Sequence, residues 1–298
     1  VHIAVSDFNN THQEYLQIDL KNPELKYNGF YLIADTGIDV IELNFYNKLT
    51  EMEFSSTIEG NYVDSDISST LGSLIINTTI PDLSRSFYIN NGDLLWTNEP
   101  QLPYPEFTGI NIDDEIVYLS TTIGRIIGLR VVGGLKVFTT MVLPDSIPNN
   151  ICATKKYLIA DFTLRNSGTK AWVSFYKETG GKYQVFQPVY ETVDIYSISD
   201  DSDVIFFCNN LSEGQIIIFN IENNLIENRI PLPNISIRHT CRLDQINYLF
   251  SDGRSIFILD LQNNSYIKVK ETNLDIVDLK YNAISNAVYI AYNNKLEV

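Results

Sequence analysis

Histidine is the residue type best suited to acid–base catalysis near neutral pH, and this chain contains only His2, His12 and His239. A catalytic histidine needs a nucleophile or an acid positioned beside it. Three histidines offer few ways to form a catalytic triad or to bind a metal ion through histidine side chains. We therefore expect no catalytic residue and no metal site, and we interpret the protein as a non-enzyme.

Three acidic clusters could supply oxygen ligands to a calcium ion. They lie at Asp64 with Asp66, at residues 113–115 and at residues 200–203. None of them continues into the Asp-x-Asp-x-Asp-Gly loop with a closing glutamate that surrounds calcium with enough oxygens. We interpret all three as solvated turns at strand ends.

Residues 180–182, Gly-Gly-Lys, are similar to the end of a phosphate-binding loop. Tyr176, however, stands where the first glycine of such a loop belongs. The match is accidental, and we expect the protein to hold no cofactor.

The cysteines Cys152, Cys208 and Cys241 lie in apolar, strand-like segments without the spacing of a metal site. We expect three buried free thiols, which suits an intracellular protein. The alternative is a Cys208–Cys241 disulfide between adjacent repeats, which would indicate an oxidising compartment and a secreted protein.

The formal net charge of −16 limits the classes of partner. Binding to nucleic-acid phosphates or to an anionic membrane requires clustered Lys and Arg. We therefore expect a protein or peptide partner, no direct contact with nucleic acid, and no membrane span, since no apolar run approaches the length of one. Because the sequence begins at Val1 rather than Met, we interpret it as a fragment, a processed form or a sequence lacking its beginning.

One hairpin-like pattern of short apolar segments recurs along the whole chain at spacings of about 40 to 47 residues. Each copy supplies the two middle strands of a sheet, and further strand patterns precede and follow it. A period of this size built from short strands is typical of a β-propeller with four-stranded antiparallel blades. The copies begin at Tyr31, Ser73, Ile116, Tyr157, Val204, Asn247 and Ala287.

The chain ends where the third strand of the last blade would end, and residues 1–7 form a strand pattern without a blade of their own. Pairing residues 1–7 as the outer strand of the last blade would leave no exposed sheet edge. We therefore predict an all-β fold, a seven-bladed β-propeller whose ring is closed by the N-terminal strand. We predict a single domain over residues 1–298.

The repeats resemble those of the WD-repeat family. That family has an Asp-Gly turn followed by an apolar strand that ends in Trp-Asp. Here Asp252 and Gly253 form the turn, and Leu259 and Asp260 take the positions of Trp-Asp. In the preceding repeat, residues 219–220, Phe-Asn, take these positions.

The resemblance implies a structural role for His239, namely a hydrogen bond to Asp252 that orders the blade. It also implies a noncatalytic scaffold for protein interactions. In such propellers, the connections between blades and the turns between the middle strands share one face, where binding residues gather.

The connections expected on that face are rich in acidic and aromatic residues. Aromatic anchors surrounded by charge suit a binding hot spot, and an acidic cleft attracts basic partners. We therefore predict that this face binds a basic peptide or protein segment. The predicted contact residues are Tyr62, Glu99, Tyr104, Glu106, Phe107, Tyr190, Glu191 and Asp194.

A second hypothesis is a secreted propeller that binds a ligand, or a gluconolactonase-like hydrolase with a metal ion in its channel. The low charged fraction of 19% suggests such a protein, and the segment YLIADTG at residues 31–37 resembles the strands of that group. A divalent ion in the channel would distinguish it from a scaffold.

Overall fold

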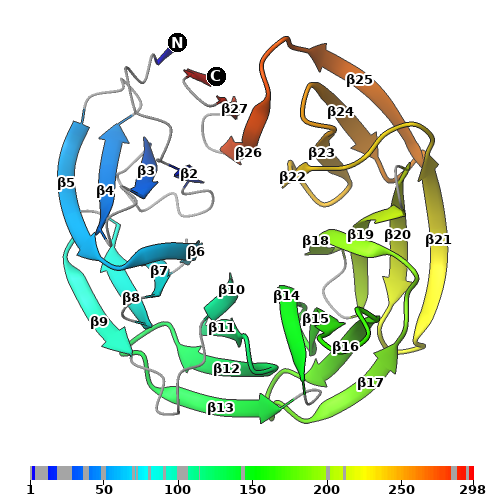
Figure 1. Cartoon of the computed structure of the whole chain (residues 1–298), viewed down its shortest axis with the longest axis horizontal. Helices are drawn as coiled ribbons and strands as arrows, with labels where there is room; N and C mark the ends of the chain where they lie inside the picture. Colours follow the sequence, from blue (N-terminus) through cyan, green and yellow to red (C-terminus); the bar gives the residue numbers. More distant parts are fainter. Residues whose placement is uncertain are drawn as a thin grey trace. The chain divides into compact units, whose positions relative to one another are not determined.

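The computed structural model contains only strands and short turns in the part of the chain that it describes (Figure 1). These residues divide into two compact units: unit 1 comprises Val1–Thr139 with Lys280–Val298, and unit 2 comprises Thr140–Leu279. The described residues are 2–3, 13–18, 29–35, 40–47, 52–68, 71, 73–79, 82–89, 92–98, 107–113, 115–141, 145–198, 202–210, 213–282, 287–292 and 295–298.

Unit 1 contains three sheets, each built from four consecutive antiparallel strands. The first sheet is β2 (Gln13–Ile18), β3 (Gly29–Asp35), β4 (Val40–Asn47) and β5 (Met52–Glu59). The second is β6 (Asn61–Ser68), β7 (Ser73–Thr79), β8 (Leu83–Tyr88) and β9 (Leu94–Asn98). The third is β10 (Phe107–Ile112), β11 (Ile116–Thr121), β12 (Arg125–Arg130) and β13 (Lys136–Met141).

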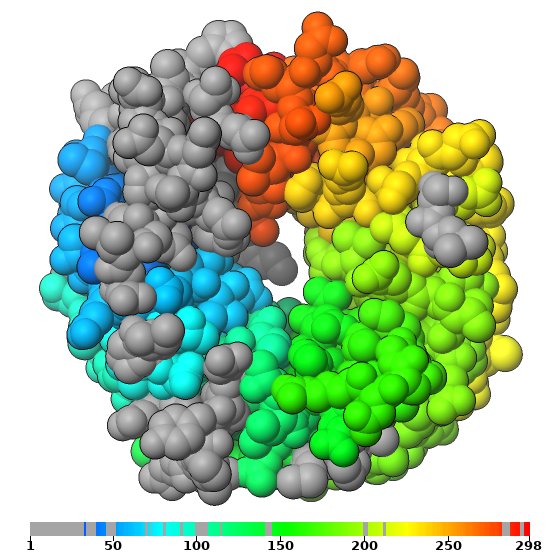
Figure 2. Space-filling view, viewed as in Figure 1, coloured from blue at the N-terminus to red at the C-terminus, as the bar shows by residue number. Residues whose placement is uncertain are grey.

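Unit 2 repeats this arrangement three times, and consecutive sheets lie against one another in the green-to-orange part of Figure 2. Its first sheet is β14 (Ser146–Ala153), β15 (Tyr157–Leu164), β16 (Lys170–Tyr176) and β17 (Lys182–Phe186). The second is β18 (Glu191–Ser197), β19 (Asp203–Asn210), β20 (Glu213–Asn220) and β21 (Leu225–Leu232). The third is β22 (His239–Arg242), β23 (Asn247–Ser251), β24 (Ser255–Asp260) and β25 (Ser265–Glu271).

One more sheet joins the two ends of the chain. It has the order β1 (His2–Ile3), β28 (Lys295–Glu297), β27 (Ala287–Tyr292) and β26 (Ile276–Asn282). His2 pairs with Glu297 and Ile3 with Leu296. The other residues of the predicted closing segment 1–7 lie outside the described residues.

The structure confirms an all-β propeller with four-stranded antiparallel blades. Six blades consist of four consecutive strands, whereas the last sheet ends in strands of only three and two residues. The count of seven blades, the closure by residues 1–7 and the single domain over residues 1–298 stay predictions.

In β15 and β19, the second strands of two blades, the central residues are mostly apolar because both faces of the strand are covered. β15 reads YLIADFTL and β19 reads DVIFFCNN, and most side chains of both strands are buried. Apolar runs of this kind are expected of strands buried on both sides. The fourth strands are different: in β25 the side chains are exposed or half-buried.

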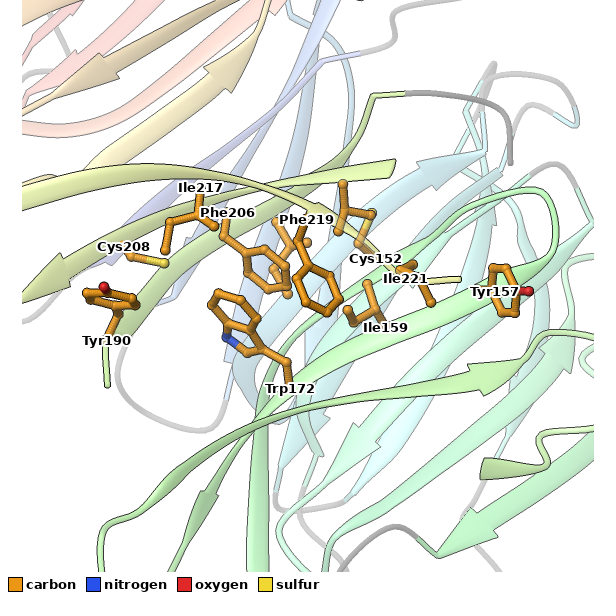
Figure 3. Packing of buried hydrophobic residues seen from close by; sticks show 12 residues of the cluster. Cys152, Tyr157, Ile159, Trp172, Tyr190, Phe206, Cys208, Ile217, Phe219 and Ile221 are labelled. Atoms are coloured by element: carbon orange, nitrogen blue, oxygen red, sulfur yellow. The ribbon is translucent and has the colours of Figure 1, made fainter. Parts of the chain in front are cut away.

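A large aromatic cluster lies in unit 2, between the sheets β14–β17 and β18–β21 (Figure 3). The Trp172 ring stacks on Phe206 with 3.7 Å between centroids, and the edge of Phe219 meets it at 5.5 Å. The indole Nε1–H donates to Thr192 Oγ1 over 3.0 Å. Trp172 therefore fills the space between two blades with its polar group satisfied.

Candidate interaction surface

In unit 2, the turns between the second and third strands lie on the same face as the connections between blades. The Arg238 N–H donates to Ser251 O (2.7 Å), and the Ile276 N–H donates to Gly253 O (2.8 Å). We call this surface the loop face. It comprises residues 165–169, 187–191, 213–214, 233–238, 252–254 and 272–275.

Gly214 holds two segments of the loop face close together. Its N–H donates to Ile235 O, and a Cβ at this position would lie 2.8 Å from the same oxygen. Only glycine allows the two backbones to approach so closely. The backbone bonds of the loop face therefore order its segments before any partner binds.

The structure describes five of the eight predicted contact residues. Tyr62 and Phe107 belong to unit 1, and Tyr190, Glu191 and Asp194 belong to unit 2. Glu99, Tyr104 and Glu106 lie outside the described residues.

Tyr190 and Phe107 are buried, with exposed fractions of 7% and 4%. The Arg229 guanidinium lies 5.7 Å from the Tyr190 ring centroid, and its Nη1 donates to the Tyr190 hydroxyl over 2.9 Å. Both rings therefore order the segments that carry them. The neighbouring Val189, 79% exposed, offers the apolar area on this part of the loop face.

Glu191 and Asp194 have different environments although both lie on β18. The Glu191 side chain is 72% exposed and lies 4.0 Å from Lys170 Nζ. Asp194 Oδ2 accepts hydrogen bonds from Tyr196 and Thr240 hydroxyls, both at 2.6 Å. Glu191 is thus available to a partner, whereas Asp194 links β18 to β22.

Tyr62 is half-buried on β6, and its hydroxyl shares a hydrogen bond of 2.8 Å with Ser65 Oγ. The residue thus remains partly exposed.

Asp64 and Asp66 link two blades of unit 1. Asp64 Oδ2 accepts from the Ile110 N–H (2.9 Å), and Asp66 Oδ2 accepts from the Ile112 N–H (2.8 Å). Burial raises the pKa of Asp64 to about 7. Interpreting these two aspartates as solvated turn residues is therefore wrong, because they tie β6 to β10.

A β-bulge precedes the linking aspartate in two blades. The register of β6 with β7 shifts between Tyr62 and Asp64, and that of β18 with β19 shifts between Thr192 and Asp194. A bulge adds a residue to one strand and redirects the side chains that follow it. The recurring bulge thus accompanies carboxylates that reach the neighbouring blade.

The loop face of unit 2 also carries three arginines, of which the sequence interpretation missed Arg165 and Arg254. Arg165, Arg238 and Arg254 are all exposed, and Arg254 Nε lies 3.1 Å from Asp275 Oδ1. Arg165 and Arg254 come from the turns between the second and third strands. Counting those turns together with the connections would have identified them from the repeat alone.

All three cysteines are buried free thiols, as predicted, so the alternative Cys208–Cys241 disulfide is not formed. Burial raises the pKa of Cys152 to about 12, and it raises that of Cys208 as well. The thiols of Cys152 and Cys208 are therefore protonated at neutral pH and are weak nucleophiles.

The positions that correspond to Trp-Asp have a structural role. Leu259 is fully buried, and Asp260 Oδ1 accepts from the N–H groups of Gln262 (2.8 Å) and Asn263 (3.2 Å). Asn264 then closes the turn with φ of 48°, a conformation that asparagine tolerates. The polar residue thus caps the turn that follows its strand.

At the other end of the same hairpin, Asp252 Oδ1 accepts from the N–H groups of Arg254 (2.9 Å) and Ser255 (2.7 Å). His239 pairs with Ser251, the residue before Asp252. The hydrogen bond between His239 and Asp252 stays a prediction.

Among the described residues, no group of three or more His, Cys, Asp or Glu side chains is placed to hold a metal ion. In the same part of the chain, no helix is long and apolar enough to span a membrane.

Comparison with solved structures identifies the fold. The C-terminal WD40 domain of Sif2 superposes with a TM-score of 0.68 at 14% identity, covering 98% of this chain and 83% of that domain. The chain folds as a WD-repeat-like propeller. The computationally designed Ika8 protein is also similar, with a TM-score of 0.67 at 11% identity over 89% of this chain and 79% of its own. No family model and no curated protein matches the sequence.

The capped turns fit this WD-repeat-like propeller. Asn220, like Asp260, accepts a backbone hydrogen bond in the turn after its strand: its Oδ1 accepts from the Asn223 N–H (2.8 Å). Phe219, which replaces the tryptophan, is 2% exposed. The resemblance noted in the sequence therefore has a structural basis in these two blades.

Proposed function

We propose that this chain is a noncatalytic protein-interaction scaffold that binds a basic peptide or protein segment on its loop face. The observation that carries the proposal is the order of that face, whose segments are joined by backbone hydrogen bonds. Loops held on a rigid scaffold are common binding sites, and propellers similar to WD40 domains are typical interaction scaffolds.

The sign of the charge supports a basic partner. The chain has 37 acidic and 21 basic residues, and exposed acids on or beside the loop face of unit 2 include Glu191, Glu213 and Asp275. Part of this charge is balanced locally: Arg254 Nε lies 3.1 Å from Asp275, a closer pair than that of Lys170 Nζ with Glu191 at 4.0 Å. Glu191 and Glu213 are therefore the acids whose reversal should most change the field that a partner meets.

The other predicted contact residues belong to the same proposal. In unit 1, Glu99, Tyr104 and Glu106 would supply charge and aromatic contacts of the same kind, and Tyr62 would add a partly exposed tyrosine. Phe107, Tyr190 and Asp194 would order the strands that carry the contacts.

Reversing two loop-face charges should weaken binding of a basic peptide. The probe is a fluorescein-labelled peptide of alternating lysine and serine, and the variant is Glu191→Lys with Glu213→Lys. We expect affinity measured by fluorescence anisotropy to fall about three- to tenfold and its salt dependence to flatten, because exposed charges act mainly on encounter.

The matched control is Glu53→Lys with Glu227→Lys, the same charge change on the exposed strands β5 and β21. It should leave the affinity near the wild-type value. An equal loss in both double variants would show an effect of net charge alone and would contradict a site on the loop face.

We further propose seven blades in one domain over residues 1–298, closed by residues 1–7. Deleting residues 1–8 should then lower the midpoint of thermal unfolding by several degrees, since it removes the pairing of β1 with β28 and exposes a sheet edge. Differential scanning calorimetry measures this directly. An unchanged midpoint would mean that the N-terminal strand does not close the fold.

A further inference from the structure

A cluster of lysines and tyrosines lies on the opposite side of the first blade of unit 2 from the loop face. Two turns form it: residues 154–156, which join β14 to β15, and residues 177–181, which join β16 to β17. The Lys177 N–H donates to Lys156 O over 3.0 Å and holds the two turns together. We call this surface the lysine–tyrosine patch, made of Lys155, Lys156, Tyr157, Tyr176, Lys177, Lys182 and Tyr183.

Both turns are rigid by their own hydrogen bonds. In the first, the Thr154 N–H donates to Tyr157 O (2.8 Å), and the Tyr157 N–H donates to Thr154 Oγ1 (3.0 Å). In the second, the Gly180 N–H donates to Tyr176 O (2.8 Å), with Gly180 at a φ of 67°. The lysines beside these turns are therefore presented from a fixed backbone.

Three tyrosine rings form a continuous aromatic surface between the two turns. Tyr157 and Tyr183 stack with 5.0 Å between ring centroids, and Tyr176 meets Tyr183 edge-on at 5.0 Å. Tyr157 is buried at one end of the aromatic cluster in Figure 3, whereas Tyr176 is 46% exposed. The rings are too close to enclose a ligand, but Tyr176 offers a supported aromatic surface to one.

The patch is locally positive in a strongly acidic protein. Lys155, Lys156 and Lys182 are exposed, and Lys177 is half-buried beside them. Among the described residues of these two turns and of the neighbouring turn 221–224, the acids are Glu178 and Glu222, so four lysines against two glutamates give this part of the surface a charge of +2. Glu222 lies 3.9 Å from Lys156 Nζ and accepts the Tyr157 hydroxyl over 3.3 Å.

Screening by dissolved salt determines which charges of the protein act on a partner bound at this surface. The Debye length is about 8 Å at physiological ionic strength, so a segment docked on the patch meets the lysines rather than the distant acids. A long nucleic acid would extend past the patch into the acidic surroundings, which disfavours it. A short segment can bind within the positive area.

We propose that the lysine–tyrosine patch binds a short acidic segment of a partner protein that carries an aromatic residue. The carboxylates would pair with Lys155, Lys156 and Lys182, and the aromatic residue would stack on Tyr176. This second site lies apart from the loop face and prefers the opposite charge. A chain with both sites would bridge a basic and an acidic partner.

The test uses the full chain and fluorescein-labelled peptides in anisotropy titrations. The probe alternates glutamate and serine around one tryptophan, and a second peptide replaces that tryptophan with alanine. We expect Lys155→Glu with Lys182→Glu to weaken binding of the tryptophan probe at least about tenfold. We expect Tyr176→Ala to weaken it about three- to tenfold and to abolish the preference for the tryptophan peptide.

The matched control is Lys136→Glu with Lys268→Glu, the same charge change on the exposed strands β13 and β25. It should leave binding of the acidic probe unchanged, and circular dichroism should show that every variant is folded. An equal loss in this control, or no loss in Lys155→Glu with Lys182→Glu, would overturn the proposal.

Two further measurements separate this site from its alternatives. An oligothymidine that binds more tightly than the peptide and is lost in Lys155→Glu with Lys182→Glu would overturn the proposal in favour of nucleic acid. The lysine–serine peptide should bind this variant as it binds wild type. Loss of binding at the lysine–tyrosine patch and loss of binding at the loop face are thus measured independently.

Discussion

Trp172→Ala should lower the free energy of unfolding by about 3–5 kcal/mol, the range found when a buried tryptophan or phenylalanine is truncated. Trp172 is 1% exposed and lies between Phe206 and Phe186, so its removal leaves a cavity between two sheets. The change also deprives the buried Thr192 hydroxyl of its indole donor. Urea unfolding followed by circular dichroism measures the loss.

Two other variants test whether this loss arises from packing. Trp172→Phe keeps an aromatic ring against Phe206 and should cost less than the alanine variant. Tyr176→Ala removes a ring from the same strand at a site that is 46% exposed, and should change stability by less than about 1 kcal/mol. A Trp172→Ala loss as small as that of Tyr176→Ala would contradict the packing role.

Asp161→Asn should remove a loss of folding stability that occurs as pH rises, because the wild-type carboxyl group is buried and must ionise. Asp161 is 1% exposed on β15 and accepts hydrogen bonds from the Asn150 N–H (2.8 Å) and Asn149 Nδ2 (3.2 Å). Burial outweighs these bonds and raises the pKa of Asp161 from 3.8 to about 6. The folded protein therefore holds this proton more tightly than the unfolded chain does.

The direction of the effect follows from proton linkage. Between pH 4 and 6 the folded state binds more protons at Asp161, so its contribution to stability is largest at low pH and falls as pH rises. A pKa difference of this size corresponds to about 3 kcal/mol. The amide that replaces the carboxyl group does not titrate, so the stability of the variant relative to wild type should increase by most of that amount, about 2 kcal/mol, from pH 4 to pH 7. Urea unfolding at both pH values measures it.

Asp260→Asn is the matched control because its shift has the opposite sign. Hydrogen bonds from the Asn263 side chain and backbone lower the pKa of this half-buried aspartate. Its contribution is present above pH 4 and is lost as pH falls, so the variant should lose stability relative to wild type as pH rises. If the stabilities of the two variants relative to wild type changed equally with pH, the environments assigned to Asp161 and Asp260 would be wrong.

The sequence predicted the blades because their pattern is local. Apolar runs such as YLIADF at 157–162 recur with a nearly constant period, and turn residues such as Asn264 and Gly180 stand where the backbone needs a positive φ. Both features depend on a few neighbouring residues and on the chemistry of glycine and asparagine. Strand positions and blade type could therefore be derived without tertiary contacts.

The predicted contact residues show that local sequence patterns do not determine which side chains are buried. Tyr190 and Phe107 follow connections between blades, which suggested exposed rings, yet other elements of the chain cover both. Arg229, which covers Tyr190, lies on the fourth strand of the blade that begins after Tyr190 and almost forty residues away in sequence. Burial of an aromatic ring at a strand start depends on such remote residues, and no local pattern reports them.

The sequence by itself determined the strand period, the buried thiols, the capped turns and the acidic balance of the chain. The tertiary structure decided that Asp64 and Asp66 bind a neighbouring strand, that arginines join the loop face, and that four lysines gather around three tyrosines. These arrangements arise when turns from different strands are joined by hydrogen bonds such as that from Lys177 to Lys156. The lysines lie near one another only because the blade's four strands fold back and forth, so sequence spacing alone could not show their shared surface.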